Sequence, residues 1–211
     1  MSDPDKLTAM PRGKLLAALV LQAITISVAG AAIWWWTGRP LAGLLAFTAE
    51  DALWSLALTG LLLATLLVLY RFFPPVVDRL ARLQAGTYAF LAEKLTFPQI
   101  VLVSLCAGIG EETLVRAGIQ TALGDWLGLV PAIALAALLF AAMHGARPLV
   151  FGLLLVIGVL FGAVFHVTGS LVAVALAHTL YDIVALKLLQ DRMHALRLFD
   201  ETGVASAETA R

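Results

Sequence analysis

Six ionisable residues interrupt apolar stretches in the second half of the chain: Glu111, Glu112, Arg116, His144, His178 and Asp182. A charged group at the centre of a membrane-spanning helix costs on the order of 2.5–3.5 kcal/mol. Three acids and one arginine left unpaired would cost roughly 10 kcal/mol, which is comparable to the entire stability of a protein, about 5–15 kcal/mol. We therefore expect these side chains to face one another or a water-filled cavity.

The spacing of these residues supports their convergence, and their types suit acid–base chemistry. Glu112 and Arg116 are four residues apart, so they share a helix face and can form an ion pair. His178 and Asp182 are also four apart and point the same way from their helix. A carboxylate in a low-dielectric site suits a general base, and either Glu111 or Glu112 could take this role. The set is therefore suited to general acid–base chemistry.

The composition places this set of residues in a membrane protein. Of 211 residues, 61% are hydrophobic and 13% are charged, whereas a soluble domain is about 45–50% apolar and about 25% charged. Fourteen basic residues balance 14 acidic ones, so a basic surface for nucleic acid is not expected. The single cysteine, Cys106, excludes an internal disulfide and a thiolate metal site.

The hydropathy pattern predicts an all-α polytopic membrane protein with about six transmembrane helices and no sheet. The expected spans cover residues 15–36, 53–73, 97–124, 128–144, 149–167 and 170–189. Residues 76–95 combine charges with apolar positions at helical spacing, which predicts an amphipathic helix at the membrane interface. A signal peptide is the alternative for the first run, but the run is too long for the apolar part of one.

We expect one folded domain in three parts. Residues 1–96 would hold two transmembrane helices and the interfacial helix, residues 97–190 a four-helix core, and residues 191–211 a polar cytoplasmic tail. With the N-terminus inside, twelve of the 14 basic residues fall in cytoplasmic segments, and Arg39 alone is outside. This asymmetry predicts an integral membrane protein, in our expectation of a prokaryotic inner membrane, with both termini in the cytoplasm.

Three motifs on three predicted helices resemble the CPBP family of intramembrane proteases, the CAAX-protease and bacteriocin-processing family also called ABI. Residues 111–116 read EExxxR, residues 140–144 read FxxxH and residues 178–182 read HxxxD. Many family members have asparagine where Asp182 stands here. The resemblance covers roughly residues 98–189 and implies an endopeptidase that cuts a membrane-associated protein or peptide within the lipid bilayer.

The resemblance also implies a role for each motif residue. Glu111 would be the general base, and His144 would help to orient the same water. His178 and Asp182 would lie on the oxyanion side of the scissile carbonyl. The supporting residues would be Glu112, Arg116 and Phe140.

Other interpretations remain open at this point. Glu111, His144 and His178 could instead hold a zinc ion with a fourth position for water, although we favour a mechanism that requires no cofactor. A proton-coupled transporter would also place acids in the membrane, but no internal repeat supports it. A non-proteolytic immunity or scaffold factor is the third alternative.

Overall fold

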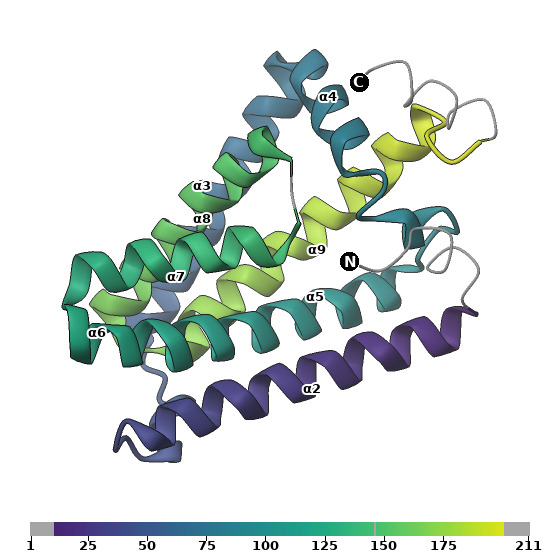
Figure 1. Cartoon of the computed structure of the whole chain (residues 1–211). Helices are drawn as coiled ribbons and strands as arrows, with labels where there is room; N and C mark the ends of the chain where they lie inside the picture. The colour runs from purple at the N-terminus through teal and green to yellow at the C-terminus, as the bar shows by residue number, and fades with distance from the viewer. Residues whose placement is uncertain (1–10, 146, 201–211) are drawn as a thin grey trace.

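A computed structural model describes residues 11–145 and 147–200, and in this part all regular structure is helical (Figure 1), which confirms the all-α prediction. The long helices are α2 (Arg12–Trp36), α3 (Ala49–Phe72), α4 (Pro74–Gln84), α5 (Phe97–Glu112), α7 (Leu129–Met143), α8 (Pro148–Thr168) and α9 (Leu171–Ala195). The shorter elements are η1 (Leu41–Leu45), η2 (Ala89–Leu91), the π-helical η3 (Thr113–Gln120) and α6 (Thr121–Leu127).

Four of these helices, α2, α3, α8 and α9, are long and apolar enough to cross a membrane. Helix α7 is equally apolar but has 15 residues. Helix α5 continues through η3 into α6 with no intervening coil. Large apolar side chains such as Leu21, Trp35 and Val156 are exposed on the outside of the bundle, as the lipid-facing surface of an integral membrane protein requires.

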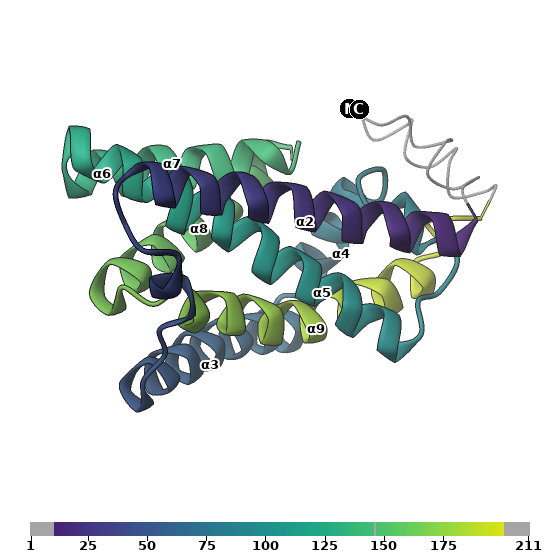
Figure 2. The ribbon, with the colours of Figure 1, turned by 90° about the horizontal axis from the view of Figure 1, so that it is seen from below.

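The helices α2, α5, α9 and α3 lie side by side in that order, which the view from below shows (Figure 2). Helices α7 and α8 pack against each other and cover η3 and α9 from another side. The central position therefore belongs to α5, η3 and α9, which together carry five of the six ionisable residues singled out above.

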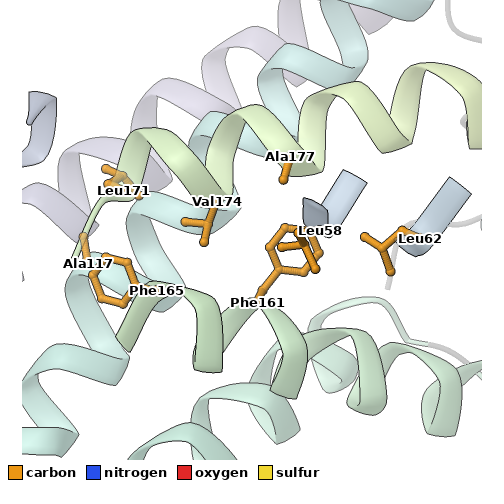
Figure 3. Close-up of a cluster of buried hydrophobic side chains, with 8 residues drawn as sticks. All are labelled: Leu58, Leu62, Ala117, Phe161, Phe165, Leu171, Val174 and Ala177. Carbon is orange, nitrogen blue, oxygen red and sulfur yellow. The ribbon is translucent and has the colours of Figure 1, made fainter. Parts of the chain in front are cut away.

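A buried apolar cluster joins α3, η3, α8 and α9 (Figure 3). Its members are Leu58, Leu62, Ala117, Phe161, Phe165, Leu171, Val174 and Ala177. Lipid tails are as apolar as these side chains, so close packing rather than removal from water holds such helices together. Helices α2 and η3 approach especially closely at Gly30. A Cβ built on Gly30 would lie 2.3 Å from the backbone oxygen of Thr113, so the two backbones are in contact where the helices cross.

Two predicted boundaries differ from the structure. The amphipathic helix expected over residues 76–95 ends at Gln84, just before Gly86 and Thr87, which are poor helix formers, and the chain continues through the short η2. The polar tail expected from residue 191 begins later, because α9 continues to Ala195 with Met193 fully buried. The expected tail beyond residue 200 lies outside the described residues.

Candidate active site

A π-helical segment follows directly after the two glutamates. Helix α5 begins with a capping box, in which the Thr96 N–H donates to Gln99 Oε1 at 2.9 Å. It changes to i→i+5 hydrogen bonding over Thr113–Gln120, where the sequence predicted a regular helix through residue 124. The hydroxyl of Thr121 donates to the Arg116 carbonyl at 3.0 Å within this altered ladder. π-Helical turns are rare and occur frequently at functional sites.

Glu112 is the fully buried centre of the polar cluster. Its Oε2 accepts from Arg116 Nε at 3.0 Å, the ion pair that the four-residue spacing predicted. Its Oε1 accepts from His178 Nδ1 at 2.9 Å, a contact between α5 and α9 that sequence reasoning missed. Close packing of these two helices makes the contact possible: a Cβ on Gly108 would lie 2.3 Å from the hydroxyl of Thr179.

Glu111 and His144 form a separate pair that is reached more easily. About a fifth of each side chain is exposed, 21% and 22%, and Glu111 Oε2 lies 3.7 Å from His144 Nε2. The Nδ1 of His144 is 2.8 Å from the Phe140 carbonyl, to which it must donate. In a neutral ring this leaves the Nε2 lone pair facing Glu111. The 3.7 Å gap is too long for a direct hydrogen bond, but one water could donate to both groups.

His178 lies between two carboxylates. Glu112 accepts from its Nδ1, and Asp182 Oδ2 lies 3.6 Å from its Nε2, with 29% of the Asp182 side chain exposed. An ionised Asp182 can only accept, so it can orient the imidazole but cannot itself stabilise an oxyanion.

The ring of Phe140 links the two histidines. It is buried, and its centroid lies 4.9 Å from that of His144 and 6.1 Å from that of His178. The guanidinium of Arg116 sits over the same ring, 5.4 Å from its centroid. Phe161 of α8 also packs against His178, with the two ring centroids 5.3 Å apart. No motif in the sequence indicated this residue.

Arg116 has a further partner that sequence reasoning missed. Its Nη1 donates to Gln120 Oε1 at 3.4 Å, and Gln120 Nε2 donates to the backbone oxygen of Gly162 at 2.9 Å. A Gln at this spacing could have been noticed, since residues 112, 116 and 120 recur every four positions.

A small cavity of about 20 Å³ opens beside His144, enough for about one water. Its lining includes Gln84 at the end of α4, Tyr88 in the segment that follows, and Arg147 just before α8. Burial raises the pKa of the Tyr88 phenol, with nearby carboxylates adding to the shift, so this hydroxyl stays protonated. Sequence reasoning did not single out Tyr88.

The proposed zinc ligands do not come together in the described part of the chain. No three His, Cys, Asp or Glu side chains lie there in an arrangement that could hold a metal ion. Both ring nitrogens of His178 face carboxylates, and His144 Nδ1 faces a backbone carbonyl. As arranged here, these three side chains do not form a zinc site.

Carboxylates and imidazoles thus lie buried among apolar helices, four of which are long enough to cross a membrane. Residues 93–184 match the family described as Type II CAAX prenyl endopeptidase Rce1-like. This segment contains all three motifs, and it confirms the resemblance to the CAAX-protease family of peptide hydrolases. No curated protein and no solved structure matches the chain.

Proposed function

We propose that this protein is an intramembrane endopeptidase that hydrolyses a peptide bond of a membrane-associated protein or peptide with a water activated by Glu111 and His144. One observation carries the proposal: two proton acceptors from different elements face each other across 3.7 Å, and the Glu111 oxygen of this pair is buried without a hydrogen-bond partner among the described residues. General base catalysis of this kind typically contributes about 10²–10⁴-fold to a rate.

The mechanism follows from the hydrogen-bonding capacity of each group. A water donating to Glu111 Oε2 and His144 Nε2 presents its oxygen lone pair to the scissile carbonyl. Glu111 takes one water proton as the C–O bond forms and then gives it to the leaving amine as the C–N bond breaks. The new carboxylic acid releases its proton to solvent. A doubly protonated His178 would donate to Glu112 through Nδ1 and to the oxyanion through Nε2.

The remaining predicted residues support these groups in this proposal. Glu112 and Arg116 hold His178 through its Nδ1. Asp182 lies 3.6 Å from Nε2, beyond hydrogen-bond distance, so it can orient the ring and leave that N–H for the oxyanion. Phe140 packs against both histidine rings. Residues 97–190 form the catalytic core, to which residues 1–96 add two spans and the interfacial α4.

We place the protein in a prokaryotic inner membrane with six spans. The fifth and sixth, beyond the four long apolar helices, are the run α5–η3–α6 and helix α7. Both termini face the cytoplasm, as does the mouth of the site beside Arg147, because basic residues gather at that end.

A farnesylated, internally quenched peptide ending in a CAAX sequence tests the activity. Purified wild-type protein should cleave it, and Glu111→Gln should lower kcat by about 10²-fold or more because the general base is lost. Glu50→Gln, on an exposed glutamate in the first turn of α3, is the matched control and should cleave normally.

Either of two results would overturn the proposal. One is a Glu111→Gln variant that cleaves at the wild-type rate. The other is a wild-type protein that cleaves neither this peptide nor any membrane protein of its own cells, compared as terminal-peptide profiles with and without the Glu111→Gln change.

Elemental analysis of the purified protein decides between the water mechanism and a zinc enzyme. We expect less than one zinc per ten chains, about the level of contamination, and undiminished cleavage after chelation. Loss of cleavage with a chelator that zinc restores would require Glu111, His144 and His178 to rearrange into a ligand set.

A further inference from the structure

We propose that Gln120 is a positioning residue for this hydrolysis, acting through Arg116 and Glu112 on His178. The inference rests on the proposed function. The contacts form a continuous chain across three helices: Gln120 to Arg116 at 3.4 Å, Arg116 to Glu112 at 3.0 Å, and Glu112 to His178 at 2.9 Å. No motif includes Gln120, which lies four residues beyond the last residue of EExxxR.

Arg116 is fully buried and has few hydrogen-bond partners, so the position of its guanidinium depends on each of them. Its Nε is bonded to Glu112 and its Nη1 to Gln120, while its Nη2 has no hydrogen-bond partner among the described residues. A buried guanidinium that loses an acceptor must seek another. Without Gln120, the acceptor that already contacts the guanidinium is the Glu112 carboxylate. We therefore expect the guanidinium to shift toward Glu112 and to pull this carboxylate away from His178.

Gln120 is itself held in place by α8. Its Nε2 donates to the Gly162 carbonyl at 2.9 Å, and only 5% of its surface is exposed. A Cβ on Gly162 would lie 2.8 Å from Gln120 Oε1, so the side chain fits because residue 162 is glycine. Gln120 also borders a cavity of about 390 Å³ at the opposite end of η3 from the glutamates. Gln120 therefore lies between the buried hydrogen-bonded residues and this cavity.

Three substitutions separate positioning from simple packing. Gln120→Leu keeps the size but removes both hydrogen bonds. Gln120→Glu keeps an acceptor for Arg116 but loses the donor to the Gly162 carbonyl, so it should retain more activity than Gln120→Leu and less than the wild type. Gly162→Ala leaves Gln120 in the sequence but places a methyl group against its amide from α8. Gly152→Ala on the same helix is the control, because a Cβ there meets nothing within 4 Å.

Kinetics on the farnesylated peptide give the first readout. Gln120→Leu and Gly162→Ala should lower kcat by about 10- to 100-fold, since small misplacements far from the chemistry have effects of this size. KM should change little, because Gln120 lies at the end of η3 remote from Glu111. Gly152→Ala should match the wild type, and the melting temperature of each variant is recorded alongside.

Histidine-selective ¹⁵N NMR gives a readout that needs no substrate. The chain has four histidines, and His178→Asn assigns the signal of interest. Wild-type His178 should show a hydrogen-bonded Nδ1–H, and Gln120→Leu should broaden or shift that signal while Gly152→Ala leaves it unchanged.

The outcomes distinguish this inference from the proposed function. If Glu111→Gln still cleaves, the proposed function fails. If Glu111→Gln is inactive but Gln120→Leu and Gly162→Ala keep wild-type kcat and an unchanged His178 signal, Gln120 is not a positioning residue. A lowered melting temperature with an unchanged His178 signal in both variants would likewise show that Gln120 serves packing alone.

Discussion

Glu111 and Glu112 are neighbours in the sequence but have different environments. Successive residues on a helix point about 100° apart, so one carboxylate faces the interior and the other the mouth of the site. Glu112 is fully buried between Arg116 and His178, whereas Glu111 is partly exposed beside His144. This difference supports a structural role for Glu112 and a chemical role for Glu111.

Glu112→Gln should destabilise the fold far more than Glu111→Gln. The substitution leaves the buried Arg116 without its counter-charge, and breaking a buried ion pair by removing one partner typically costs about 3–5 kcal/mol. Unfolding by denaturant in detergent micelles, followed by circular dichroism, measures the difference. Equal stability of the two variants would show that Arg116 finds another partner and that Glu112 is not the centre of the cluster.

The sequence predicted contacts within one helix but not those between helices. The pairing of Glu112 with Arg116 follows from a spacing of four, and the structure confirms it. The bond from His178 to Glu112 spans 66 positions and depends on how closely α5 and α9 approach, which no local pattern encodes. Tyr88 and Phe161 were missed for the same reason, since each reaches the site from an element without a motif.

Among the elements, α2 has a larger part in the site than its sequence indicates. It carries none of the motifs, yet it packs along α5 and η3. Gly30 and Gly118 allow this contact, with a Cβ on Gly118 only 3.0 Å from the Gly30 Cα. Helix α2 therefore supports the π-helical segment at Thr113, Leu114 and Gly118.

Gly30→Ala should push α2 away from η3. The added methyl would lie 2.3 Å from Thr113 O and 2.7 Å from Leu114 Cα, which are backbone atoms that cannot turn aside. We expect a loss of about 1–3 kcal/mol in stability, as for other overpacked sites, together with reduced cleavage. Gly60→Ala in α3 is the control, since nothing lies within 4 Å of its Cβ, and thermal melting should show it unchanged or slightly more stable. Identical melting of both variants would contradict the close crossing.

The existence and type of the elements followed from hydropathy, whereas their local distortions did not. Apolar runs predicted α3 and α8 to within a few residues. The π-helical turns of η3 were not predicted, because apolar periodicity over eight residues does not distinguish i→i+4 from i→i+5 hydrogen bonding. The end of α9 was placed too early because Gln190 reads as polar, although its side chain binds the Leu95 backbone in the interior.

At the scale of the whole molecule, the two ends of the bundle differ in their number of basic residues. One end gathers Arg12, which donates to the Phe90 carbonyl at 3.1 Å, and Arg192, which pairs with Asp78. At the other end, Arg39 makes a bidentate pair with Asp125 at 2.8 Å. Basic residues at the first end favour its placement in the cytoplasm.

Thiol labelling in intact cells tests this orientation. In a Cys106→Ser background, Ala42→Cys and Arg82→Cys place single thiols at exposed positions near opposite ends of the bundle. A membrane-impermeant maleimide should label the first in intact spheroplasts and the second only after lysis. The reverse pattern would place both termini outside.

The 66 positions between Glu112 and His178 also set an order of events during synthesis. At about 5–20 residues per second, the ribosome needs roughly 3–13 s to make the intervening chain. During that interval Arg116, made almost together with Glu112, is the carboxylate's only partner from the cluster. The nascent span thus enters the bilayer with Glu112 already paired with Arg116, while the contact of Glu112 with His178 can form only after α9 has been made.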